Sequence, residues 1–155
     1  MTASPYTWRC PIPLFSSTIP YMKILIALAL TSAIGSAPFV NQNDELAKSI
    51  KKGKLIYSDN CISCHLGNGL GVPNAFPPLA KSDYFVKNPA NAIKAVKFGL
   101  MGKITVNGTV YDNMMPNPGL DDAEIADVVN YIMNDWGNDS KGALITPEMV
   151  SEVEE

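Results

Sequence analysis

The residues best suited to chemistry in this sequence are two cysteines and a histidine in the run Cys61-Ile62-Ser63-Cys64-His65. Two thiols at this spacing can form thioether bonds to the two vinyl groups on one edge of a porphyrin. A histidine directly after the second thiol can then reach the iron. Because C-x-x-C-H is the attachment signature of c-type haem, we expect Cys61 and Cys64 to bind one haem c covalently, with His65 as proximal iron ligand.

Three other uses of a C-x-x-C pair are disfavoured. A redox-active dithiol of the thioredoxin kind needs a βαβ context, and no such alternation surrounds the motif. A structural zinc site needs four nitrogen or sulfur ligands, whereas His65 is the only histidine in the chain. A plain disulfide between Cys61 and Cys64 would leave the adjacent histidine unexplained.

The single histidine also restricts the second axial ligand, which must be Met, Lys, water or nothing. Met115 is followed by Pro116 in a predicted loop, and a proline restricts the residue before it to extended geometry. We expect Met115 to bind the iron opposite His65. Packing is the alternative use of a methionine. Met114 and Met101 are further candidates, while Met133 falls within a predicted helix.

Periodicity and capping signals predict the elements that position these residues. Apolar spacing at Leu46, Ile50, Gly53 and Tyr57 indicates a helix that runs into the motif. Gly53 on its apolar face suggests that another helix crosses closely there, unless the glycine is merely tolerated. A Gly- and Pro-rich stretch over 67–78 predicts an irregular loop.

Further signals predict the second half of the domain. A short helical turn starts at Ser82, and Asn88 followed by Pro89 begins a second helix. The residues Asn107-Gly108 predict a type I′ hairpin. Asp121 and Glu124 form a capping box that opens a last helix, whose apolar face is Ile125, Val128, Val129, Ile132 and Trp136, with Gly137 as its stop.

The two ends of the chain are expected to lie outside this domain. Met22-Lys23, an apolar run over 24–30 and small residues over 31–37 predict a secretory presequence at 1–37, with Met22 as an alternative start. Cleavage is expected near Gly35 to Ala37. The protein is then exported or periplasmic, and membrane-associated only if the signal is uncleaved. Residues 142–155 are rich in acids and are expected to fray as a tail.

Composition limits the possible partners. The formal net charge is −3, so there is no basic excess to indicate nucleic-acid binding. After the presequence is removed, no segment is long and apolar enough to span a membrane.

The order of helix, C-x-x-C-H, Pro-rich loop, middle helices, Met-Pro loop and last helix resembles the class I cytochrome c family over residues 42–138. The resemblance implies an all-α fold of four to five helices around one covalently bound haem, with a small hairpin before the distal Met loop, in a domain at 38–141. The family's distal Met matches Met115. Its proline whose carbonyl accepts from the proximal His matches Pro77, and a haem-packing residue matches Leu79. The helix crossing matches Gly53, Tyr57 and Tyr131.

This resemblance implies an electron carrier rather than an enzyme, with redox proteins as donor and acceptor. Residues 106–137 also resemble the cytochrome domains associated with quinoprotein dehydrogenases or copper nitrite reductases. The alternative is therefore a cytochrome subunit of a larger oxidoreductase, such as one of these or an oxidase, rather than a free monomer. A peroxidase-like haem enzyme is a further alternative, but it lacks a distal His or Arg, because the only Arg is Arg9 in the presequence.

Overall fold

The structure is a computed structural model that describes residues 41–155. The presequence predicted at 1–37 and the alternative start at Met22 lie outside the described residues. The described elements are α2 (Gln42–Asn60), α3 (Ile62–His65), α4 (Asp83–Lys87), α5 (Pro89–Phe98), β1 (Lys103–Val106), β2 (Thr109–Asp112), α6 (Asp122–Asn134) and α7 (Pro147–Ser151). Among residues 41–155, no helix has the length and apolar character that a membrane crossing requires.

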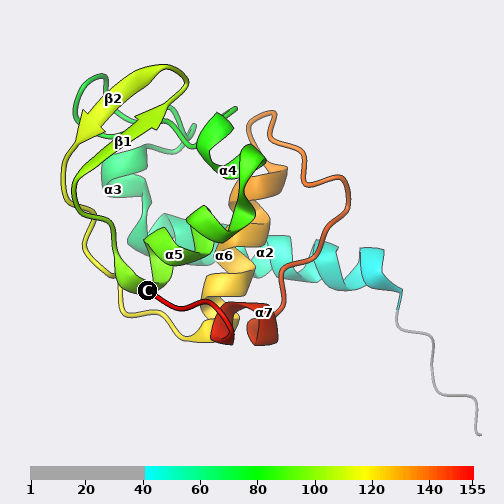
Figure 1. Ribbon diagram of the computed structural model, residues 1–155. Coiled ribbons are helices and arrows are strands. Elements are labelled where there is room, and N and C mark those ends of the chain that lie inside the picture. The colour runs from blue at the N-terminus through cyan, green and yellow to red at the C-terminus, as the bar shows by residue number, and fades with distance from the viewer. Residues whose placement is uncertain (1–40) are drawn as a thin grey trace, which may run out of the picture. The chain divides into compact units, whose positions relative to one another are not determined.

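The long helix α2 crosses α6 at Gly53, as its apolar spacing predicted (Figure 1). A Cβ atom on Gly53 would overlap the backbone carbonyl of Asp127 and lie 2.9 Å from the Cβ of Tyr131. Only glycine therefore permits this approach of the two helices. Tyr57, one turn further along α2, packs its ring 5.5 Å from that of Tyr131 and 4.9 Å from that of Trp136, measured between ring centroids.

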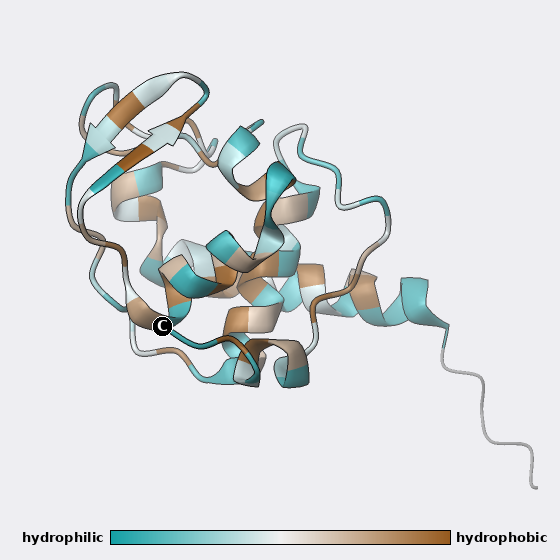
Figure 2. Ribbon diagram, in the orientation of Figure 1, coloured by the Kyte–Doolittle hydropathy of each residue, from teal (hydrophilic) through white to brown (hydrophobic). Residues whose placement is uncertain are grey.

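The core lies where α5 and α6 come together, and Figure 2 shows hydrophobic residues concentrated there. The predicted apolar face of the last helix is buried at Ile125, Val128, Val129 and Ile132. The capping box of Asp121 and Glu124 is present, because each side chain bonds a backbone N–H that the first helical turn leaves free.

The predicted end of this helix is wrong by a few residues. Helix α6 ends at Asn134, so Trp136 lies beyond it, with φ of 51°. The Asn138 side-chain amide donates to the carbonyl of Ile132 at 2.7 Å and thereby satisfies a carbonyl of the last helical turn. The indole of Trp136 packs on the core from the loop instead.

The small ribbon is the predicted hairpin, with β1 and β2 antiparallel and Val106 paired to Thr109. Asn107 and Gly108 both have positive φ, 50° and 79°, which is the conformation that a type I′ turn requires. Asn88 caps α5 through its side chain, which accepts from the N–H of Ala90.

The expectation that residues 142–155 fray is wrong. Val150 in α7 is fully buried and Ile145 is 5% exposed. The Asn130 side chain accepts from the N–H of Ile145 and donates to its carbonyl. Lys97 donates to the carbonyl of Val150 at 2.7 Å. The segment therefore runs back along α6 in Figure 1, and its acidic side chains point to solvent.

Candidate functional site

The C-x-x-C-H motif continues directly from α2 into the one-turn helix α3. The N–H of Cys61 donates to the carbonyl of Tyr57, and the N–H of His65 donates to the carbonyl of Cys61 at 3.0 Å. The thiols of Cys61 and Cys64 are free and half-buried, whereas His65 is buried. Burial, and then the neighbouring Cys64, raise the pKa of the Cys61 thiol to about 11.

The imidazole of His65 is oriented by one hydrogen bond. Its Nδ1 lies 3.1 Å from the carbonyl oxygen of Pro77. A carbonyl only accepts, so Nδ1 carries the proton and the lone pair of Nε2 is free for a metal. Burial lowers the pKa of His65 below its ordinary value of 6.5, against the opposing effect of the Pro77 bond, and favours the neutral form that ligation requires.

The loop after the motif is folded so as to present that carbonyl. Gly71, with φ of 62°, donates from its N–H to the carbonyl of His65 at 3.1 Å. A Cβ atom on Gly71 would lie 2.7 Å from the carbonyl oxygen of Pro77, so a larger residue would displace the acceptor of the His65 bond. The N–H of Leu79 donates to the carbonyl of Gly69 at 2.7 Å and closes the loop.

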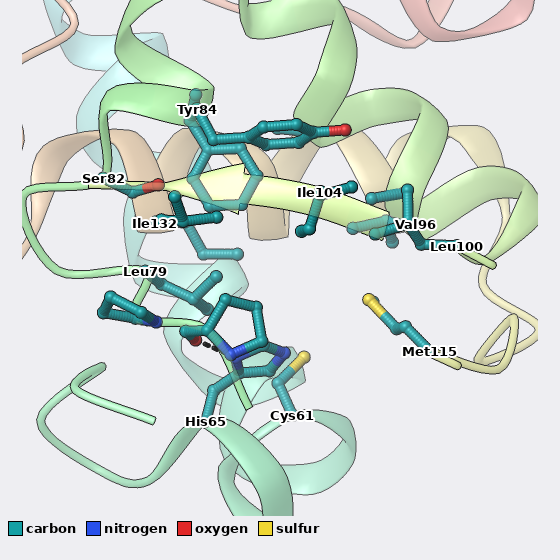
Figure 3. Close-up of a pocket in the computed structure, with 16 residues that line it drawn as sticks. Cys61, His65, Leu79, Ser82, Tyr84, Val96, Leu100, Ile104, Met115 and Ile132 are labelled. Atoms are coloured by element: carbon teal, nitrogen blue, oxygen red, sulfur yellow. Dashed lines mark hydrogen bonds between the residues drawn. The ribbon is translucent and has the colours of Figure 1, made fainter. Parts of the chain in front are cut away.

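Met115 lies across the pocket from His65, and Figure 3 shows its sulfur and the imidazole approaching the same space from opposite sides. Reciprocal backbone hydrogen bonds with Leu100, of 2.9 and 2.8 Å, fix the Met115 backbone. The other methionines named above are placed differently. Met114 is 63% and Met101 82% exposed, whereas Met133 is buried in the hydrophobic core.

Two adjoining apolar pockets make up the site. Both are lined by His65, Pro77 and Met115, while Cys61 lines one and Cys64 the other. The predicted residue Leu79 lies in the pocket of Cys61. The structure thus brings together all six predicted site residues: Cys61, Cys64, His65, Pro77, Leu79 and Met115.

Sequence reasoning missed several lining residues. Val96, Leu100 and Ile104 carry no signal of their own in the sequence, yet all three line the pocket. Ser82, predicted only as the start of a helical turn, contributes a buried hydroxyl. No local pattern distinguishes these residues from ordinary core, because the pocket forms only when the segments meet.

The donor set fits a covalently held porphyrin better than a metal ion bound by the chain alone. Within residues 41–155, no three His, Cys, Asp or Glu side chains gather to hold a metal ion, and the two thiols are not joined as a disulfide. What the described residues do provide is two free thiols, an imidazole with a free Nε2, a facing thioether and an apolar slot. These features define a haem c-binding protein of mostly helical fold.

Comparison with known proteins agrees with this class. The Cytochrome c family model matches residues 50–136. Cytochrome c-552 of Thermus thermophilus is 37% identical over 113 residues, which cover 70% of this chain and 76% of that protein. The chain therefore belongs to the cytochrome c family, whose members carry electrons on covalently bound haem c. The family and fold predicted from the sequence are confirmed.

Other relatives are parts of larger enzymes. The cytochrome c subunit of a quinone-type alcohol dehydrogenase from Gluconobacter oxydans is 34% identical over 97 residues, 59% of this chain and 20% of the subunit. The cytochrome c subunit of gluconate 2-dehydrogenase from Pantoea cypripedii is 31% identical over 122 residues, 71% of this chain and 27% of that subunit. The chain thus spans only a small part of these subunits.

Proposed function

We propose that this protein carries single electrons through one haem c, which Cys61 and Cys64 hold covalently and His65 and Met115 ligate axially, and that it catalyses no reaction of its own. The observation that carries the proposal is the placement of the Met115 sulfur opposite the His65 imidazole across an apolar pocket. When bound, haem c supplies the one-electron couple of its iron.

The chain's own residues make that couple suitable for transfer. Pro77 fixes the His65 ring and raises its basicity through the Nδ1 hydrogen bond. The backbone pair between Leu100 and Met115 holds the opposite ligand. Because both ligands are anchored by backbone, they keep their positions in both oxidation states. Little then reorganises when an electron moves. Apolar side chains such as Val96 and Ile104 exclude water from the pocket.

The same observations disfavour a peroxidase-like enzyme. Peroxide chemistry needs an open iron position and a polar distal group, usually His or Arg. Besides the two cysteines and His65, the polar side chains that line the two pockets are Ser82, Tyr84, Tyr111 and Asn113, and among the described residues the lining contains no Arg and no second His. The side-chain amide of Asn113 donates to the carbonyl of Ala75 at 2.8 Å, so this hydrogen bond already holds it to the loop that contains Ala75.

The proposed location is the periplasm or the exterior of the cell, supported by the signal-like composition of residues 1–37. The proposed partners are a redox protein that donates and another that accepts electrons. Such encounters are brief and use small interfaces.

Two measurements on the purified protein test the proposal. Haem absorbance should stay with the polypeptide after extraction with acidified organic solvent, and should be lost in a variant carrying Cys61→Ser and Cys64→Ser. Voltammetry should give one reversible one-electron wave. Extractable haem, or rapid turnover of peroxide by the intact protein, would contradict the proposal.

A second candidate, a cytochrome subunit of a larger dehydrogenase, is favoured by the relatives from Gluconobacter oxydans and Pantoea cypripedii. Size-exclusion chromatography of native extract separates the two candidates. A free carrier elutes near its own mass of 16.7 kDa or less, whereas a subunit co-elutes with dehydrogenase activity.

A further inference from the structure

Ser82 carries a buried hydroxyl for which the folded chain supplies no partner. The residue is 1% exposed, and its Oγ makes no hydrogen bond within the described residues. It occupies the N-cap position of α4, where a serine normally accepts from the backbone, yet its side chain makes no capping bond. A buried hydroxyl is rarely left unpaired in a folded protein, so this one is expected to meet a group from outside the chain.

The position of Ser82 indicates which group that is. Ser82 lines the same pocket as Cys61 and His65. Figure 3 shows Ser82 and Tyr84 at the end of the pocket away from Cys61. In a porphyrin of this kind the propionates are attached on the edge opposite the two vinyl groups. Thioether bonds at Cys61 and Cys64 therefore direct the propionate edge away from the motif.

We propose that the Ser82 hydroxyl donates a hydrogen bond to a propionate carboxylate of the haem, an inference that rests on the function proposed above. A carboxylate is acceptor-only when ionised, and a hydroxyl is a suitable donor to it. Tyr84 also lines this pocket, but Figure 3 shows its hydroxyl directed away from Ser82, toward the side of Ile104 and Val96.

The chain holds Ser82 in place through its neighbour. Asp83 donates from its N–H to the side chain of Asn107 at 3.0 Å, and the N–H of Asn107 donates to the Asp83 carboxylate at 2.7 Å. Lys87 also donates to that carboxylate at 2.8 Å. The Asp83 carboxylate is therefore paired with Lys87 and bonded to the hairpin turn, so its negative charge does not repel a propionate. The Asn107-Gly108 turn thus anchors the loop that carries Ser82.

The hydrogen bond has an electrostatic consequence. A donor that shares the propionate's negative charge reduces the field which stabilises ferric iron, and this effect is strong in an apolar pocket. Removing the donor leaves the charge less compensated. The ferric state is then favoured and the midpoint potential falls.

Resonance Raman spectroscopy of the intact haem protein tests the assignment, because the propionate bending mode reports hydrogen bonding to the carboxylate. In Ser82→Ala we expect this mode to shift to lower frequency and the midpoint potential to fall. Ser82→Thr, which keeps the hydroxyl, should restore both values toward those of the wild type. Ser140→Ala is the matched control, since Ser140 is also buried but bonds Asn134 outside the pocket.

Two results would overturn the assignment of Ser82 to a propionate. If Ser82→Ala folds with covalent haem and keeps both the Raman mode and the potential of the wild type, Ser82 does not bind a propionate. Equal shifts in Ser82→Ala and Ser140→Ala would likewise overturn it, because they would indicate a general loss of packing. If the wild type holds no covalent haem at all, the failure belongs to the proposed function.

Discussion

Replacing Asn130 with alanine should detach the C-terminal segment from the domain. The Asn130 side chain is buried in α6 and forms two hydrogen bonds with Ile145, from Nδ2 to the carbonyl at 2.8 Å and from the Ile145 N–H to Oδ1 at 2.9 Å. It also donates to Ser49, which keeps its own bond to Asp127. The substitution therefore leaves two backbone groups of Ile145 without partners in a buried position.

The magnitude follows from those two groups. A buried polar group left unpaired costs about 1–3 kcal/mol, so the pair predicts a loss of about 2–6 kcal/mol. The greater helix propensity of alanine offsets at most about 0.7 kcal/mol of this loss. Urea unfolding followed by far-ultraviolet circular dichroism measures the change in the free energy of unfolding. Limited proteolysis should release the residues after Ser140 sooner than in the wild type.

Asn43→Ala is the matched control, because Asn43 is exposed at the start of α2 and its replacement should change stability by no more than about 0.5 kcal/mol. If Asn130→Ala behaves like this control, and its proteolysis pattern is unchanged, the reasoning about the C-terminal segment is refuted.

Two substitutions and a pH titration test the helix crossing at Gly53, the loop at Gly71 and the hydrogen bonds of Asp83. Gly53→Ala should lower stability by about 1–3 kcal/mol in thermal unfolding, because overpacking of two helices outweighs the helix preference of alanine; a stabilised variant would contradict the crossing. Gly71→Ala should destabilise by more than about 1 kcal/mol, because φ is positive there. It should also raise the midpoint potential in voltammetry by disturbing the carbonyl of Pro77 and making the proximal imidazole less basic; an unchanged potential would count against that role. The hydrogen bond from Lys87, and then that from the backbone N–H of Asn107, hold the pKa of the Asp83 carboxyl below its ordinary value of 3.8. The stabilisation that follows from the lowered pKa is complete above pH 3.8 and is lost as pH falls through that pKa. The NMR chemical shift of the Asn107 backbone N–H should report this titration. A pKa of Asp83 at or above 3.8 would contradict the prediction.

Elements that depend on a few neighbouring residues could be predicted from the sequence. The Asn107-Gly108 hairpin, the N-cap at Asn88 and the capping box that opens α6 are each specified by backbone chemistry within one turn. The C-x-x-C-H motif is equally local, because two thioether bonds and one axial ligand fix its spacing.

Features that depend on distant segments could not be predicted. Helix α7 is short and acidic, and its burial depends on Lys97 and Asn130, which lie far from it in the sequence. The early end of α6 follows from a side-chain bond made by Asn138. The role of Ser82 becomes visible only when its loop meets the pocket. Local chemistry favoured Met115 because Pro116 follows it, but Met114 and Met101 stayed candidates until the structure showed that both are exposed.

The absorption spectra of the ferric wild type, Met115→Ala and Met114→Ala test most directly whether Met115 binds the iron opposite His65. The weak long-wavelength band that reports a methionine sulfur on ferric haem should be present in the wild type. It should persist in Met114→Ala, whose side chain is 63% exposed, and disappear in Met115→Ala. A band that survives Met115→Ala, or a high-spin wild type that binds added cyanide quickly, would contradict axial ligation by His65 and Met115 and the electron-carrier function built on it.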